Sequence, residues 1–153
     1  MQLAKYLILF LIINFGSLAI GSWLMDNGPM SNWYRSLNQA PWTPAGWVFG
    51  LAWTSIMVFF SIYLAFLFQQ ENNVKRKVLY ILHIFLNISW NYIFFNQHLV
   101  GLGLFTIVLL TIVLLYYFFT FNTQLKKIRL LLVPYLLWLF IATSLNAYIL
   151  FNN

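Results

Sequence analysis

The stretch NWYRSLNQAPWTPAGWVFGLAWT, residues 32–54, leads into a long apolar segment and is dense in tryptophan. It contains four of the seven tryptophans of the chain, namely Trp33, Trp42, Trp47 and Trp53. Tryptophan gathers at membrane interfaces, but an interfacial belt needs only one or two such residues at each helix end. Pro41 and Pro44 fix φ and keep the preceding residues out of the α region. We therefore predict a shaped aromatic lid ahead of a helix, and such a lid favours a flat, apolar ligand.

The composition around this stretch is that of an integral membrane protein. Hydrophobic residues make up 63% of the chain, charged residues make up 7%, and the mean hydropathy is +0.83. Five apolar segments each approach the about 20 residues that cross the hydrocarbon core of a bilayer. They are residues 4–23, 47–68, 78–96, 100–121 and 130–151. The sequence predicts an all-α integral membrane protein, a five-transmembrane-helix bundle in one domain (residues 1–153), with a tryptophan-rich lid at residues 24–46.

The basic residues fall unevenly on the two sides of the predicted spans. Seven lie on the N-terminal side, namely Lys5, Lys75, Arg76, Lys77, Lys126, Lys127 and Arg129. Arg35 alone lies on the other side. The positive-inside rule then predicts a cytoplasmic N-terminus and an outer C-terminus, in a bacterial cell membrane. The net charge of +6 is explained by this topology and by attraction to anionic headgroups, so we expect no nucleic-acid partner.

Missing residue types exclude several classes of protein. The chain has no cysteine, which excludes thiolate catalysis, disulfides and cysteine metal sites. Its two acidic residues, Asp26 and Glu71, lie in connectors, and the one lysine within a predicted span, Lys5, stands at its very start. A paired-carboxylate hydrolase, a proton-coupled exporter and a retinal protein are therefore not expected.

Neutral polar residues concentrate in the third span. Six residues there share an arc of roughly 100° on a helical projection, namely His83, Asn87, Trp90, Asn91, Phe94 and His98. Because amides in lipid need partners, this face should look into the bundle, where Asn87 and Asn91 bond either to other helices or to a ligand. His83 and His98 lie about 22 Å apart along a helix. No cysteine or acid is near them, so we expect no metal site.

The fifth span has a similar face after Pro134. Trp138, Ala142 and Leu145 are spaced at i, i+4 and i+7. A large ring beside smaller neighbours either leaves room for a ligand or lets another helix pack closely.

Three motifs resemble the TspO/MBR family of translocator proteins, also called tryptophan-rich sensory proteins or peripheral benzodiazepine receptors. The first comprises Trp33-Tyr34, Leu37, Pro41-Trp42, Pro44, Phe49 and Trp53-Thr54. The second comprises Leu86-Asn87, Trp90 and Phe94-Phe95, and the third comprises Pro134-Tyr135-Leu136, Trp138 and Leu145-Asn146. The motifs occur in order, with matching gaps, over most of the chain.

This resemblance implies a bundle whose pocket opens under the first connector and binds porphyrins or related tetrapyrroles. By position, the pocket would be lined by Trp53, Asn87, Trp90, Phe94, Trp138, Ala142 and Leu145, with Trp33, Trp42 and Pro44 in the lid. The tetrapyrrole would be a ligand, and no resident cofactor is expected. The resemblance also allows a homodimer, although the third span lacks a face of small residues. Ala45 and Gly50 stand where many family members have proline, which predicts a more mobile lid.

Three function classes follow. The favoured one is a receptor or transporter-like protein that binds tetrapyrroles for their metabolism or for stress sensing. The alternative is an enzyme that degrades porphyrins with light and oxygen, with Trp33 and Trp138 as redox-active groups. In the third class the polar faces only hold together a lipid-organising bundle, and the dense tryptophan lid argues against it.

Overall fold

The computed structural model describes residues 1–121 and 126–153, and most of the described chain is helical. The long helices are α1 (Gln2–Leu24), α3 (Gly46–Gln70), α4 (Val74–Asn91), α5 (Val100–Thr120) and α6 (Val133–Asn152). The short ones are the 3₁₀ turn η1 (Gly28–Met30), α2 (Asn32–Ser36), the π-helical turn η2 (Tyr92–Asn96) and the 3₁₀ helix η3 (Ile128–Leu132). The described residues contain no strand.

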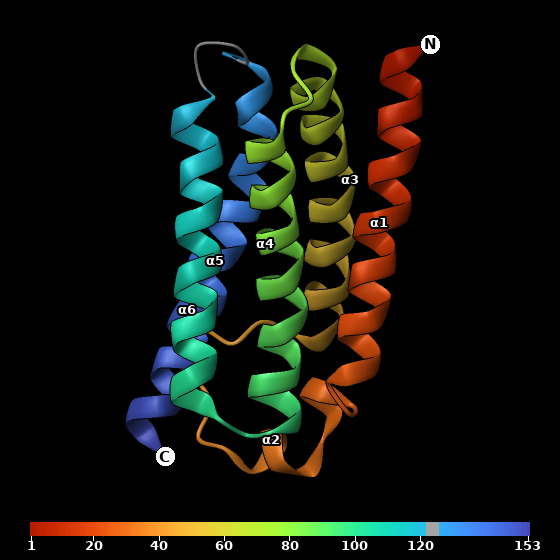
Figure 1. Ribbon diagram of the computed structural model, residues 1–153. Coiled ribbons are helices and arrows are strands. Elements are labelled where there is room, and N and C mark those ends of the chain that lie inside the picture. The colour runs from red at the N-terminus through yellow and green to blue at the C-terminus, as the bar shows by residue number, and fades with distance from the viewer. Residues whose placement is uncertain (122–125) are drawn as a thin grey trace.

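The five long helices form a closed ring (Figure 1). α1 packs on α3 and α4, α5 packs on α4 and α6, and α6 closes the ring on α3. Within the described residues, five helical segments are long and apolar enough to cross a membrane, and each contains one long helix. The predicted fold, an all-α five-transmembrane-helix bundle, is confirmed.

Several helices begin or end a few residues away from the predicted spans. α4 begins at Val74 rather than at residue 78, because its first turn is built from the basic run. The Asn73 side chain caps this turn by accepting a hydrogen bond from the backbone N–H of Arg76 at 2.9 Å. At its other end, α4 passes into the π-helical turn at Tyr92. Apolar length predicts where the chain crosses the membrane, whereas the polar cap at Asn73 sets where α4 begins.

Both the interior and the exterior of the ring are apolar. Phe60 is fully buried, whereas Ile12, on the outside, is 67% exposed. Hydrophobicity alone therefore does not specify how the helices pair, and buried polar contacts add that specificity. Asn14 of α1 donates to the Ser61 hydroxyl of α3 at 2.8 Å and accepts from the Tyr80 hydroxyl of α4 at 2.7 Å. These contacts connect three helices.

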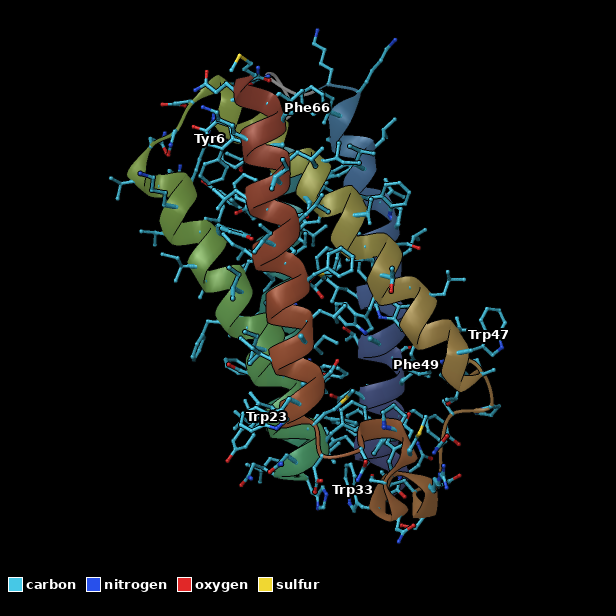
Figure 2. The ribbon with its side chains drawn as sticks, turned by 90° about the vertical axis from the view of Figure 1, so that its right-hand side faces the viewer. Tyr6, Trp23, Trp33, Trp47, Phe49 and Phe66 are labelled. Atoms are coloured by element: carbon cyan, nitrogen blue, oxygen red, sulfur yellow. The ribbon has the colours of Figure 1, made fainter. Side chains whose placement is uncertain are left out.

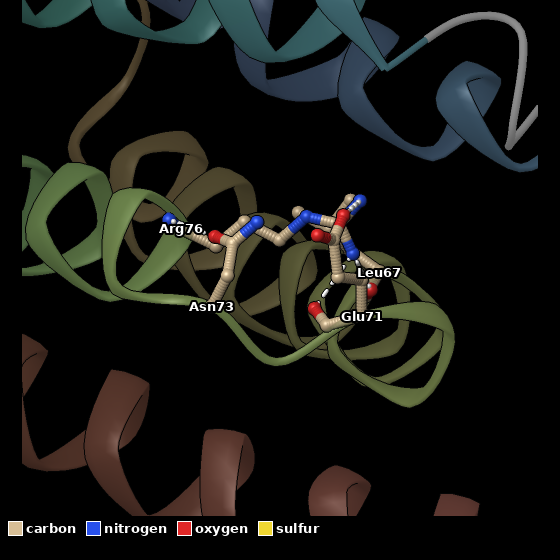
Figure 3. Close-up of polar contacts among 4 residues, drawn as sticks. All are labelled: Leu67, Glu71, Asn73 and Arg76. Atoms are coloured by element: carbon tan, nitrogen blue, oxygen red, sulfur yellow. Dashed lines mark hydrogen bonds and ion pairs between the residues drawn. The ribbon is translucent and has the colours of Figure 1, made fainter.

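Arg76 is buried at the turn between α3 and α4 (Figure 3), although its place in the basic run suggested an exposed charge. Its guanidinium donates to the carbonyls of Leu67 and Glu71 and forms an ion pair with the Glu71 carboxylate at 3.0 Å. The last carbonyls of a helix lack partners within that helix. Arg76 therefore caps the C-terminus of α3 and fixes the turn into α4.

The two ends of the bundle differ in charge. The N-terminus, the α3–α4 turn, the end of α5 and the start of η3 lie at one end, and α2 and the C-terminus lie at the other (Figure 1). We call the second end the lid end, and we call residues 25–45, which join α1 to α3, the lid. Arg35 belongs to α2, at the lid end.

Candidate functional site

The lid begins with a tight turn directly after α1. Asp26, Asn27 and Gly28 have φ values of 44°, 64° and 46°, in the left-handed region. Asp and Asn tolerate this region better than other side chains do. Gly28 adopts this conformation without the strain of a Cβ atom, and an added Cβ would also displace the Met25 side chain, whose sulfur lies 2.5 Å from that position. The turn directs the chain across the end of the bundle, where Ser31 caps α2 by accepting from the Tyr34 backbone N–H.

Aromatic contacts fasten α2 to the η2 turn. The Trp33 ring stacks on His98, with centroids 4.0 Å apart and an interplanar angle of 14°. Trp33 also meets Phe94 at 5.6 Å, and Tyr34 meets Phe95 at 5.4 Å. Trp33, predicted as a lid residue, therefore covers the end of η2 and does not line the main cavity.

The second half of the lid is attached to α6. The Trp42 indole N–H donates to the Ser144 hydroxyl at 3.1 Å, and the ring meets Tyr148 edge-to-face at 5.5 Å. Nearer α2, the Asn38 backbone N–H donates to the side-chain oxygen of Asn153 at 2.8 Å. Trp42 is 54% exposed, and neither Trp42 nor Pro44 is among the residues that line the main cavity inside the bundle.

A cavity of about 200 Å³ lies inside the lid-end half of the bundle, between α1, α3, α4 and α6. Its lining is Ser17, Leu18, Ser22, Met25, Pro29, Phe49, Gly50, Trp53, Thr54, Asn87, Trp90, Asn91, Phe95, Trp138 and Ala142. Five of the predicted pocket residues are among these, namely Trp53, Asn87, Trp90, Trp138 and Ala142. The structure therefore brings together residues from three separate predicted spans.

The two other predicted pocket residues, Phe94 and Leu145, line a separate space of about 20 Å³. This space shares four lining residues with the main cavity, namely Phe49, Trp90, Phe95 and Ala142. It has room for about one water molecule and not for a macrocycle. Phe94 and Leu145 therefore pack behind the cavity wall.

The aromatic walls are held by contacts between helices. Phe49 of α3 meets Trp138 of α6 edge-to-face at 5.2 Å, and Trp53 of α3 meets Tyr135 of α6 at 6.0 Å. Such pairs contribute about 0.5–1.5 kcal/mol beyond the burial of their area. In Figure 2, Phe49 points from α3 toward α6, whereas Trp47 points away from the bundle. These pairs close the side of the cavity between α3 and α6.

The Trp90 indole is oriented by a polar residue behind the wall. Its N–H donates to the side-chain oxygen of Asn146 at 3.2 Å, and the Asn146 amide nitrogen donates to the Val100 carbonyl at 2.9 Å. Asn146 thus joins α4, α5 and α6. The sequence motif contains Asn146, but its positioning role became visible only in the structure.

The two amides of α4 have different surroundings. Asn91 donates to the Asn87 backbone carbonyl at 3.1 Å and packs against Gly21, where an added Cβ would lie 3.0 Å from the Asn91 nitrogen. Asn91 is thus a packing residue between α1 and α4 as well as part of the wall. Asn87 is only 3% exposed, and its side-chain oxygen has no hydrogen-bond partner among the described residues. This oxygen is a buried acceptor in the cavity wall.

Neither histidine lines the cavity. His83 is buried nearer the other end, where its Nε2 lies 2.9 Å from the Tyr135 hydroxyl and joins α4 to α6. His98 is exposed at the lid end and has a φ of 56°. The single helical face predicted across residues 83–98 is therefore interrupted, because the π-helical turn and the left-handed residue change the helical repeat.

The residues that the sequence did not predict come mainly from α1 and from the start of α3. α1 contributes Ser17, Leu18 and Ser22. Asn14, Ser17 and Gly21 are buried and follow helical spacing, so the signal for the inner face of α1 lies in its small and polar residues. Gly50 was predicted only as a departure from the family pattern that makes the lid more mobile, and Thr54 only as part of the family motif.

Comparison with known proteins agrees with the motifs. The model of the TspO/MBR family matches residues 8–151. The tryptophan-rich protein TspO of Chlorobaculum tepidum is 35% identical over 130 residues, which cover 82% of each chain. The tryptophan-rich sensory protein of Cereibacter sphaeroides is 31% identical over 117 residues, which cover 74% of this chain and 72% of its own. Protein CrtK of Rhodobacter capsulatus is 30% identical over 118 residues, which cover 74% of each chain.

These similarities extend over the membrane-spanning part of the chain and support a membrane sensory or transport-like role. The five apolar helices, together with the similarity to these bacterial proteins, indicate an integral membrane protein. The chain belongs to the TspO/MBR family.

Proposed function

We propose that this protein is a membrane receptor or transporter-like protein that binds a porphyrin or a related tetrapyrrole in the cavity between α1, α3, α4 and α6. The wall of that cavity supports the proposal. Trp53, Trp90 and Trp138 surround a space that also contains the unpaired amide oxygen of Asn87. Indole rings make stacked and edge-to-face contacts with flat macrocycles. A mostly apolar wall with a few polar groups is typical of small-molecule sites.

The size of the cavity limits how the macrocycle is held. Its volume of about 200 Å³ is below the about 300–1,000 Å³ of common ligand pockets. One edge of a tetrapyrrole therefore inserts between the indoles, and the remainder occupies the opening or displaces side chains. Asn87 would accept a hydrogen bond from a donor on the inserted edge.

The charge of the wall limits which edge inserts. No lysine, arginine, aspartate or glutamate is among the residues that line the cavity. An ionised carboxylate is costly inside a membrane unless it is paired. The inserted edge is therefore the apolar one, and any carboxylates of the ligand remain near the lipid headgroups.

A titration in darkness tests this proposal. Protoporphyrin IX is added to the purified protein, and tryptophan fluorescence is followed. Saturable quenching that weakens in Trp90→Ala, but not in the exposed Trp23→Ala, is the expected result. Quenching that never saturates, or that is lost equally in both variants, would contradict the proposal.

The same samples, illuminated in air, test the light-dependent alternative. One observation favours that alternative, because the oxidisable ring of Trp138 forms part of the cavity wall. Stable porphyrin absorbance with saturable binding supports a receptor or carrier. Protein-dependent bleaching to a new product supports an enzyme.

A further inference from the structure

We propose that the ligand reaches the cavity sideways from the lipid bilayer, through an opening between α1 and α3, rather than from water through the lid. The opening is bordered by Ser22 on α1 and by Gly50 and Thr54 on α3, and we call it the portal. This inference rests on the proposed function, because it concerns the route to the same cavity.

Exposure identifies the portal. Of the residues that line the cavity, three are exposed, namely Ser22, Gly50 and Thr54. All three lie on the two helices that border one side of the ring. Gly50 has no other atom within 4 Å of the place where a Cβ would stand. The cavity therefore opens to the outside of the bundle between α1 and α3.

The pairing of α1 with α3 explains why the opening lies there. Toward the other end of the bundle the two helices are in contact, through Phe10 and Phe68 at 4.9 Å and through the bond from Asn14 to Ser61. Toward the lid end they diverge, as Figure 2 shows.

The same antiparallel register places small residues on both sides of the opening. The pairing of Asn14 with Ser61 can be extended along both helices at the same rise per residue. Ser22 then lies at about the level of Thr54, and Met25 at about the level of Gly50. Glycine and short hydroxyl side chains are too small to fill the space between the diverging helices. The opening thus follows from the sequence of the two facing segments.

The other sides of the cavity are closed by close contacts among the described residues. Gly21 and Asn91 bring α1 and α4 together, and the Phe49–Trp138 pair closes α3 against α6. At the lid end, Tyr34 packs on Phe95. A route through any of these sides would have to break packed contacts, whereas the three residues that border the portal are exposed.

The portal lies just inside the membrane surface. Trp23 and Trp47, which adjoin the portal in sequence, are 81% and 72% exposed. Exposed tryptophans mark the headgroup level of a bilayer. Gly50 and Thr54 lie about 6 Å and about 12 Å along α3 from its first residue. The portal therefore faces the outermost acyl chains of one leaflet, where a flat amphiphile rests with its ring buried and its polar edge at the surface.

Single cysteines test the portal, since the chain has none of its own. Ser22→Cys and Gly50→Cys place a thiol at the portal. Gly16→Cys and Gly46→Cys are matched controls, because both glycines are exposed and have open space around them but lie outside the cavity. Each variant is placed in phosphatidylcholine vesicles and reacted with N-cyclohexylmaleimide. Protoporphyrin IX is then supplied from a second set of vesicles, and tryptophan quenching is followed by stopped flow.

Modification of Cys at position 22 or 50 is expected to slow association about tenfold or more, because the added group stands in the open side of the cavity. Damage to the site itself would instead act mainly by speeding dissociation. Modification at position 16 or 46 is expected to change neither rate. Unchanged association after modification at both 22 and 50, or equal slowing in the controls, would overturn the portal. Absence of saturable quenching in the unmodified protein would instead overturn the proposed function, and the portal with it.

Discussion

Asn146 illustrates how one side chain supports the site from behind. It accepts from the Trp90 indole and donates to the Val100 carbonyl, and it is 1% exposed. Removing it leaves a buried donor and a buried acceptor without a partner. Unpaired buried groups cost about 1–3 kcal/mol, although hydrogen bonds between membrane helices are often worth less.

We therefore expect Asn146→Ala to lower the free energy of unfolding by about 1–2 kcal/mol and to weaken porphyrin binding several-fold. Thermal unfolding and the dark titration measure the two effects. Asn152→Ala is the control, because that side chain is exposed and bonds only to a carbonyl of its own helix. Equal stability and affinity in the two variants would contradict the positioning role.

Trp138 allows the two candidate functions to be separated. Trp138→Phe keeps an aromatic ring against Phe49, so the affinity for protoporphyrin IX should fall only modestly. If the protein degrades porphyrin through tryptophan chemistry, turnover under light should disappear while binding survives. Trp33→Phe is a useful comparison, since Trp33 stacks on His98 outside the cavity. Loss of binding and turnover in equal measure would not support a redox role for Trp138.

At the scale of the helices, α5 contributes no lining residue but still shapes the site. Its Gly103 lies where an added Cβ would be 3.2 Å from the Asn146 side-chain oxygen and 3.2 Å from Phe94. This close approach lets α5 support both α6 and the η2 turn.

Gly103→Ala is expected to destabilise the protein by about 1–3 kcal/mol, because the new methyl group displaces Asn146 or Phe94. Gly16→Ala on α1 meets no atom within 4 Å, so it should leave stability unchanged or raise it by up to about 1 kcal/mol. Unfolding curves in matched detergent give both values. A destabilised Gly16→Ala or an unaffected Gly103→Ala would show that these glycines are not distinguished by packing.

The helices also differ in how well their inner faces could be predicted. α4 and α6 carry amides and tryptophans at helical spacing, so the sequence identified Asn87, Trp90 and Trp138 as wall residues. In α1, Asn14, Ser17 and Gly21 share one buried face, but this face has no tryptophan and only one amide, so it indicated helix packing more than a cavity wall. The π-helical turn at Tyr92 was also unpredictable, since its apolar residues fit an ordinary helix. The sequence thus predicted five of the fifteen residues that line the cavity, and helix packing supplied the rest.

At the scale of the whole molecule, the charges at the two ends of the bundle predict how it is oriented in the membrane. The basic residues lie mainly at the end that holds the N-terminus and the α3–α4 turn, away from the lid (Figure 1). Arg76 belongs to this group by sequence but is buried and paired with Glu71. The more accessible charge therefore comes from the exposed lysines, namely Lys5, Lys75, Lys77, Lys126 and Lys127.

From this asymmetry we predict a cytoplasmic N-terminus and a lid on the outer side. Gln2→Cys and Asn32→Cys place single thiols at opposite ends, on exposed residues. In intact bacteria, a membrane-impermeant maleimide should label Cys at position 32 and leave position 2 unlabelled until the cells are opened. The reverse pattern would place the lid in the cytoplasm.

The pair of hydrogen bonds between Asn38 and Asn153 has a practical consequence for anyone who handles this protein. A group attached after Asn153, such as an affinity tag or a fluorescent protein, is expected to weaken these two hydrogen bonds and so to loosen the segment between α2 and α3. Binding data collected with a C-terminal fusion would then describe a loosened cover over the site. A tag at the opposite end of the bundle, before Gln2, avoids this artefact.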